Sequence, residues 1–358
     1  MDTTLDLKKE YLAAAYPAAE KKASGRGVAP AAQYLIFAAV LSAFQWLLKG
    51  GLLTSSFVFA IGNTMIYAIV AIGFCLLLGY SGLASLGTAG FIGIGAYAAF
   101  YAMQEFGLGF ALAFVLTVAA SLVIGVLVGF ISLRIEGIYL AILTLGLSEI
   151  LRNLFISLKA TVKIDMSNVR LFGAQVGETE IYFLILAVFV VLLIITSNLI
   201  RSPIGRALLA IKNSSSAAQA MGVSLMKYRL LAFVISTVYA AIAGLLYMLF
   251  IRNMTTSSST LLTMATSLNI LGAVIIGGAK SLWGTTFGVF IIYGLQSIFL
   301  SKIRFFIEHP AFITMITGLL IIVIVMFFPG GVAQMVGGLR LWMKKKALQR
   351  RAGRDGSK

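Results

Sequence analysis

Few residues in this chain could carry chemistry. Glu136 and Glu149 are the acids within or near the apolar segments, and Glu149 precedes Arg152 by three residues, which places both side chains on one helix face. An ionisable residue inside a membrane span is a functional candidate by default. We place this pair at the outer end of its span and interpret it first as a structural ion pair. Cys75 and His309 are the single residues of their kinds, so they exclude a disulfide framework and a Cys/His zinc cluster.

A second candidate is Gly277–Ser281, "GGAKS", which resembles the end of a phosphate-binding loop. That loop requires Gly-Lys-Ser/Thr in direct succession after a strand, whereas Ala279 interrupts it here and apolar segments flank it. We therefore interpret Lys280 as an anchor at the membrane interface. The sequence predicts no catalytic residue, no cofactor and no metal site, and any ATP hydrolysis is expected in a separate subunit.

The elements that must position these residues are membrane helices. Of the 358 residues, 60% are hydrophobic and 11% are charged, a composition that requires lipid as the main solvent. We predict an all-α polytopic integral membrane protein of about ten transmembrane segments. Their approximate bounds are 31–48, 58–79, 83–103, 110–133, 137–157, 181–199, 230–251, 264–279, 283–301 and 312–328. Six glycines fall within Gly79–Phe100, and we expect that segment to be broken or bent.

The basic residues predict the orientation. Residues 1–30, 200–229 and 340–358 carry most of them, and with Arg134 and Lys280 they place 20 of the 28 Lys and Arg residues on one side. We therefore expect both termini in the cytoplasm, a cytoplasmic arm at 1–30, a transmembrane permease domain at 31–331 and a basic tail at 332–358. Because the positive charge follows the membrane edge, it indicates contact with anionic lipid and no nucleic-acid binding.

The long connection at 200–229 predicts two short helices. Pro203 suits the first helical position, and Ile204, Leu208 and Ile211 recur at the spacing of one buried face. The "NSSS" run at 213–216 ends that helix and offers N-caps for a second, formed by Ala217, Ala218, Ala220 and Met221, with Gly222 as its C-cap. We expect Arg206 and Lys212 on the rim of this loop. The alternative is an ordinary amphipathic connector that lies on the headgroups.

This loop and its surroundings resemble a known family. Ser216–Gly222, "SAAQAMG", has the spacing of the Glu-Ala-Ala-x-x-x-Gly loop of ABC importer permeases, with Ser216 in place of Glu. The loop, "GLASLGTAGFIGIGAYAAF", "EGIYLAILTLGLSEILRN", "LNILGAVIIGGAKSLWGTTFG" and "FFPGG" together resemble the permease subunits of branched-chain amino acid (leucine/isoleucine/valine) ABC importers. The match covers most of residues 58–331 and is nearer to the larger of the two permease types.

The resemblance implies a coupling helix seated on an ATPase. Its partners would be two ATP-binding subunits, a second permease subunit and an extracytoplasmic substrate-binding protein, in a bacterial plasma membrane. The absence of Glu at 216 could alter one polar contact of this docking. The residues expected on the docking surface are Gly205, Arg206, Ala210, Ile211, Ala217, Ala218, Met221 and Gly222.

Small and weakly polar residues predict the path for a small zwitterion. Ser81, Ser85, Ala89 and Gly93 recur at i+4 and are expected to form one small helix face. The segments that start at Ser85 and Ser281 share a short sequence similarity, which could mark two structurally related halves of the chain, as transporters often have. The residues predicted to line the path are Ser81, Ser85, Gly87, Gly90, Tyr139, Thr144 and Ser148.

The sequence leaves other functions open. Permeases of the same superfamily move urea and other amides, sugars or nucleosides. A secondary carrier driven by an ion gradient would carry buried acids or an ion site in mid-span, which these segments almost lack. A purely scaffolding membrane protein would leave the loop at 200–229 unexplained.

Overall fold

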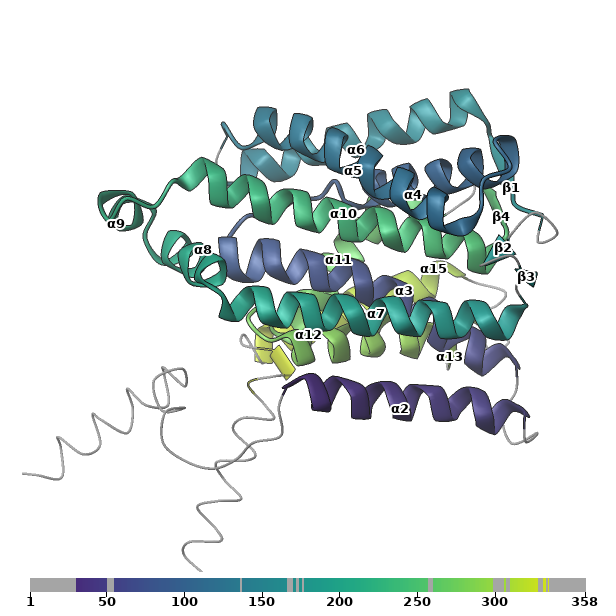
Figure 1. Cartoon of the computed structure of the whole chain (residues 1–358). Helices are drawn as coiled ribbons and strands as arrows, with labels where there is room; N and C mark the ends of the chain where they lie inside the picture. The colour runs from purple at the N-terminus through teal and green to yellow at the C-terminus, as the bar shows by residue number, and fades with distance from the viewer. Residues whose placement is uncertain are drawn as a thin grey trace, which may run out of the picture.

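The computed structural model describes residues 30–49, 55–135, 137–165, 170–171, 174–175, 177–256, 260–298, 306, 310–327, 331–332 and 334. Almost all of the predicted arm and tail, together with Glu136 and His309, lie outside these residues. The described part is a bundle of helices whose long axes run broadly in one direction (Figure 1).

One buried helix forms the centre of the bundle. α3 (Ser55–Phe74) continues into a π-helical stretch, Cys75–Ser81, and most of its side chains are fully buried. It packs against α7 (Glu178–Arg201), α10 (Leu225–Ile251), α11 (Met264–Gly277) and α12 (Leu282–Val289). This apolar run is hydrophobic on every side, as expected for a helix that contacts only other helices.

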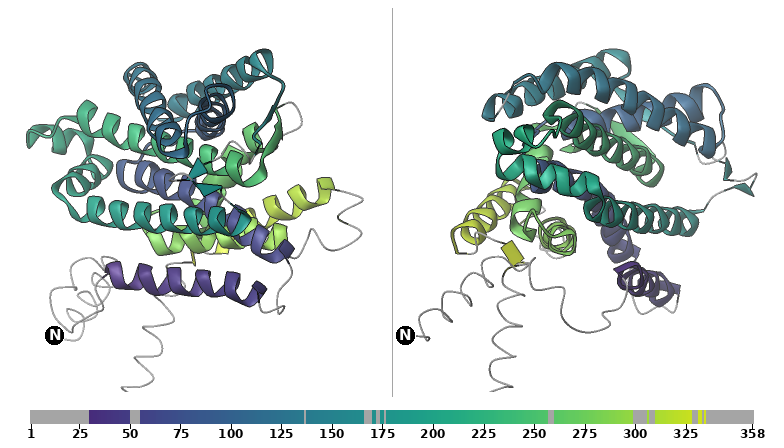
Figure 2. Two further views of the ribbon diagram at one scale, coloured as in Figure 1. Left: turned by 45° about the vertical axis from the view of Figure 1, so that its right-hand side comes forward. Right: turned by 60° about the vertical axis from the view of Figure 1, so that its left-hand side comes forward.

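Other helices form the flanks of the bundle. α5 (Phe110–Ser132) and α6 (Ile138–Leu158) lie together at one edge, and α2 (Pro30–Lys49) lies at the opposite edge (Figures 1 and 2). α4 (Thr88–Phe100) packs against α5, α6 and α10, whereas α2 packs mainly against α7. α5 and α6 are the two long apolar helices that other parts of the chain cover least.

Each of the ten predicted segments contains a helix. Five helical stretches in the described residues have the length and apolar composition needed to cross a membrane: 56–81, 110–132, 138–158, 179–201 and 225–251. The remaining segments correspond to α2, α4, α11, α12 with α13 (Leu295–Ile298), and α15 (Pro310–Phe327). The chain is therefore a multi-pass membrane protein.

The glycine-rich segment Gly79–Phe100 is broken, as predicted. Helical structure stops at Ser81, residues 82–87 are non-helical, and α4 begins at Thr88. Gly82 has a φ of +74°, a left-handed conformation that only glycine adopts without strain. The expectation that Ser81, Ser85, Ala89 and Gly93 share one helix face is wrong, because Ser81 lies before the break, Ser85 lies within it, and only Ala89 and Gly93 lie in α4.

The segments that start at Ser85 and Ser281, whose sequences are similar, have the same order of secondary structure. α4 follows a non-helical link and ends in a π-helical turn, Tyr101–Glu105; α12 follows the link 278–281 and ends in a π-helical turn, Phe290–Gly294. This shared order of link, helix and π turn agrees with the weak similarity between their sequences.

Short strands occur only in connections within the described residues. β1 (Thr161–Lys163) pairs antiparallel with β4 (Asn253–Thr255), and β2 (Arg170–Leu171) pairs with β3 (Ala174–Gln175). The all-α expectation therefore holds for the spans but not for these connections. The strands lie at the end of the bundle opposite the 200–229 loop (Figure 1).

Candidate functional site

The 200–229 loop forms two short helices that project from one end of the bundle (Figure 1). α8 (Pro203–Asn213) begins with proline, and the Ser202 hydroxyl caps it by accepting a hydrogen bond from the Ile204 amide at 3.2 Å. α9 (Ser215–Ala220) is capped by the Ser214 hydroxyl, which accepts from the Ala217 amide at 3.3 Å. The predicted order of two helices is confirmed, although α9 ends one residue before Met221.

The outer surface of this loop includes five of the predicted docking residues. Met221 is 84% exposed on the loop, where its apolar side chain is open to a partner. Gly222 has a φ of +80° and has open space around its Cα. The other exposed members of the predicted set are Arg206, Ala210 and Ala217. Their contact with a partner stays a prediction.

The other three residues predicted to lie on the docking surface are not at the surface of the loop. Gly205, Ile211 and Ala218 are buried, so they shape the loop from within and do not lie on its surface. A Cβ on Gly205 would collide with the backbone of Ile200, so only glycine allows α8 to turn back this closely on α7.

Lys212, which was expected on the rim of the loop, has its side chain directed into the protein. Its ammonium turns inward from α8 and donates hydrogen bonds to the carbonyl oxygens of Leu78 at 3.0 Å and Gly79 at 2.7 Å. Burial lowers the pKa of Lys212, and the nearby positive charge of Lys280 lowers it further. Lys212 follows Leu208 by four residues, so the helical spacing already placed it on the buried face.

Lys212 therefore joins the loop to the end of the central helix. Its side-chain carbons lie against Gly82, where the Cγ would be 3.2 Å from an added Cβ. A cavity of about 330 Å³ adjoins this contact and is lined by residues of the break, by Gly137, by the α8–α9 turn and by Arg229 of α10. The break is held from another side by Tyr80, whose hydroxyl donates to the Lys280 carbonyl at 3.0 Å.

The break in turn contacts α6. The Leu86 amide donates to the Thr144 hydroxyl at 3.0 Å, and an added Cβ on Gly87 would lie 3.0 Å from the Thr144 carbonyl oxygen. Gly90 approaches Ser148 in the same way, one turn further along. A chain of direct contacts thus runs from α8 through Lys212 and the break to α6.

Six of the seven residues predicted to line the path are buried, and only Tyr139 is exposed. Ser81 lines the cavity of about 330 Å³ beside Lys212, whereas Gly87, Gly90, Thr144 and Ser148 lie in the contacts between the break, α4 and α6. Their contact with a substrate stays a prediction. The buried six are Ser81, Ser85, Gly87, Gly90, Thr144 and Ser148.

The Glu149–Arg152 ion pair is present, with 2.7 Å between Glu149 Oε1 and Arg152 Nη1. Its position differs from the expectation, because Glu149 is the twelfth of the 21 residues of α6 and so lies near the middle of the helix. The Glu149 side chain is 47% exposed and the Arg152 side chain 24% exposed, and both lie on the surface of the chain.

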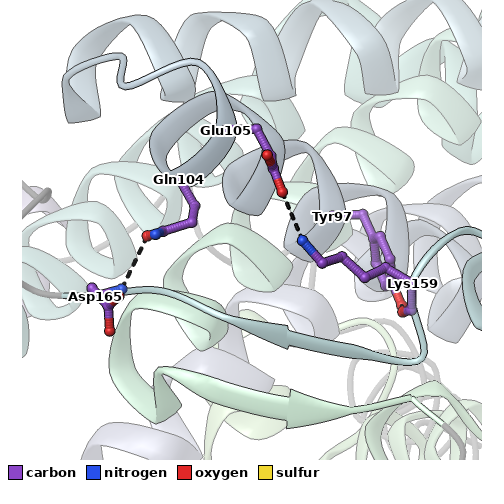
Figure 3. Close-up of polar contacts among 5 residues, drawn as sticks. All are labelled: Tyr97, Gln104, Glu105, Lys159 and Asp165. Atoms are coloured by element: carbon purple, nitrogen blue, oxygen red, sulfur yellow. Dashed lines mark hydrogen bonds and ion pairs between the residues drawn. The ribbon is translucent and has the colours of Figure 1, made fainter.

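At the opposite end of the bundle, polar contacts fix α4 to the connection that contains β1 (Figure 3). Lys159 Nζ lies 2.6 Å from Glu105 Oε1, and the Asp165 amide donates to Gln104 Oε1 at 3.1 Å. The Tyr97 hydroxyl donates to the Lys159 carbonyl at 2.6 Å. These bonds hold the far end of α4 while its first turn packs on α6.

An apolar helical bundle with a two-helix loop projecting from one end is the architecture of a multi-pass membrane protein. A family model described as "Branched-chain amino acid transport system / permease component" matches residues 56–325, and the chain belongs to this family of ABC permeases. The resemblance inferred from the sequence motifs is confirmed.

Curated relatives agree with this assignment. The chain is 30% identical over 291 residues to the high-affinity branched-chain amino acid transport system permease protein LivM of Salmonella typhimurium and to that of Escherichia coli. Each match covers 73% of this chain and 66% of the relative, slightly under two thirds of its length. The probable ABC transporter permease protein YphD of Escherichia coli is 29% identical over 175 residues, which cover 45% of this chain and 52% of YphD. No solved structure gave a significant match.

Proposed function

We propose that the protein is the permease subunit of an ABC importer that moves branched-chain or related small amino acids into the cell. The observation that carries this proposal is the 200–229 loop, which presents the exposed Met221 and Gly222 at the end of the bundle on a scaffold of family-typical sequence. Two LivM relatives named for high-affinity branched-chain amino acid transport support the substrate class.

In this proposal the loop is the docking site for an ATP-binding subunit. Small residues such as Ala210 and Ala217 allow close approach of a partner surface, Met221 supplies an apolar contact, and Arg206 can pair with acidic groups. Closure of two ATPases would pull on this loop, and the contacts of Lys212 would carry the movement to the break and to α6. A second permease subunit and an extracytoplasmic binding protein complete the assembly.

The proposed topology has ten crossings with both termini in the cytoplasm. The loop end, which also carries Arg134, Lys280 and the five basic residues of 200–229, would be the cytoplasmic end. The end that carries β1 and β4 would then face the binding protein (Figure 1). Labelling of single introduced cysteines from either side of the membrane tests this orientation.

Reconstitution tests the function. The chain would be assembled in liposomes with its second permease subunit, two ATPases and the binding protein, and uptake of leucine, isoleucine, valine and urea would be measured with and without ATP. We expect ATP-dependent uptake of the three amino acids. Uptake driven by a proton or sodium gradient without ATP would overturn the class, and uptake of urea, a sugar or a nucleoside in place of the amino acids would overturn the substrate.

A further inference from the structure

We propose that the exposed face of α6 lines the translocation path and that Glu149 and Arg152 hold the ammonium and carboxylate groups of the transported amino acid. This inference rests on the proposed function and names the residues that recognise the substrate. It is carried by a polar stripe on the surface of α6, defined as Gly146, Glu149, Arg152, Asn153 and Ser157.

The depth of the stripe is the first argument. α6 has 21 residues and a length of about 31 Å, close to the thickness of the hydrocarbon core. Glu149 therefore lies about 16 Å from the start of the helix, near mid-membrane. Charged groups at this depth are costly in contact with lipid tails, and they usually face the interior of a bundle or a water-filled cavity.

The neighbouring helix supplies the comparison. α5 lies beside α6 at the same edge of the bundle (Figure 2), and every exposed residue of α5 is apolar. Its small and polar residues, such as Thr117 and Ser121, are buried against the rest of the chain. α5 therefore has the surface of a lipid-facing helix. From Glu149 onward α6 differs: Glu149, Asn153 and Ser157 are exposed on one side of its surface, and Ile150, Leu154 and Leu158 are exposed beside them. The polar side of α6 is therefore suited to water or protein, and the apolar side to lipid.

The interior of the described bundle is closely packed through its middle. The central helix is almost entirely buried, six of the seven path residues expected from the sequence are buried, and the polar cavity beside Ser81 and Lys212 adjoins the loop at one end of the bundle. A path for a zwitterion is thus better placed on the outside of α6, where a second permease subunit would form the opposite wall.

The chemistry of the stripe matches an α-amino acid. The Glu149–Arg152 pair has no net charge, and its two members can separate to accept an ammonium on the carboxylate and a carboxylate on the guanidinium. Uncharged urea or a sugar has no charges to complement this pair.

The face next to the pair suits a branched aliphatic side chain. Ile142 is 60% exposed and lies two turns before Glu149 on the same face. Between them, an added Cβ on Gly146 would meet nothing within 4 Å, so the surface is open there. Charged groups beside an apolar, uncrowded surface provide the two features by which a branched-chain amino acid can be recognised.

Thiol accessibility tests the position of the stripe. Cys75, the single cysteine of the chain, is fully buried, so an introduced Asn153→Cys would be the reactive thiol and would leave the ion pair intact. In the complete importer we expect a charged thiol reagent to modify Asn153→Cys, and leucine-loaded binding protein to cause a loss of this labelling. Leu122→Cys, on the exposed apolar face of α5, is the matched control and should stay unmodified. An unreactive Asn153→Cys in the assembled importer would overturn the proposal.

Uptake tests the pair itself. The double variant E149Q/R152Q keeps the shape of both side chains, and we expect it to assemble normally but to lower ATP-dependent leucine uptake about tenfold or more. The control is Leu122→Met, a conservative exchange on the exposed apolar face of α5. Normal uptake by E149Q/R152Q, or failure of this variant to copurify with the second permease subunit, would overturn the proposal, the latter in favour of a subunit contact. Absence of leucine uptake by the unmodified importer would instead refute the proposed function.

Discussion

The replacement Lys212→Met tests whether the 200–229 loop is mechanically joined to the core. Methionine keeps most of the unbranched side chain that lies against Gly82, but it removes the ammonium group. The carbonyl oxygens of Leu78 and Gly79 then lose their donor at 3.0 and 2.7 Å. The change therefore separates the hydrogen bonds of Lys212 from its packing.

The size of the effect follows from these two bonds. A hydrogen bond to a charged group contributes about 1.5–3 kcal/mol. The adjoining cavity of about 330 Å³ can supply water to the two carbonyl groups, which recovers part of that free energy. We expect a net weakening of the contact between α8 and the end of the central helix by about 2 kcal/mol, or about 30-fold in its equilibrium constant.

The assay is the ratio of leucine taken up to ATP hydrolysed by the importer in liposomes. We expect Lys212→Met to lower this ratio, because the ATPases would still move the loop but the break would follow less often. Lys212→Arg should restore part of it by keeping a charged donor, and Lys227→Met, at an exposed lysine of the same loop, is the matched control. A wild-type ratio for Lys212→Met would refute the role of this contact.

Three further substitutions test other parts of the structure. Gly222→Asp adds a negative charge and places a side chain at a φ of +80°, at a cost of about 1 kcal/mol; the protein should insert normally but lose coupling, and unchanged substrate-stimulated ATP hydrolysis in liposomes would contradict this. Gly95→Ala would force a Cβ into the backbone of α10 and should lower the melting temperature in detergent, whereas Gly146→Ala, which meets open space, should leave it unchanged. Tyr97→Phe removes the hydroxyl that joins α4 to the end of α6 and should lower the free energy of unfolding by about 1–3 kcal/mol, with Tyr139→Phe, an exposed tyrosine, as the control.

Local features of the sequence determined much of the fold. The apolar runs predicted a helix in each of the ten segments, because a chain in lipid must satisfy its backbone hydrogen bonds within helices. Pro203 and the "NSSS" run at 213–216 predicted where α8 and α9 begin, since helix starts of this kind depend on neighbouring residues only. The glycines of Gly79–Phe100 predicted the break for the same reason.

The tertiary structure decided which side of each helix is covered. Thr144 and Ser148 are polar enough to line a path, yet the glycines of the break and of α4 approach α6 so closely that both are buried. Lys212 is charged and was therefore expected on the rim of the 200–229 loop. Its ammonium instead donates to two backbone carbonyl groups that are over 130 positions away in the sequence. Glu149 and Arg152 pair within one turn, which their spacing predicted, whereas their exposure near mid-membrane depends on which helices pack against α6. Spacing along the chain sets the neighbours within a helix, but only the packing of distant segments determines which of its faces remains open.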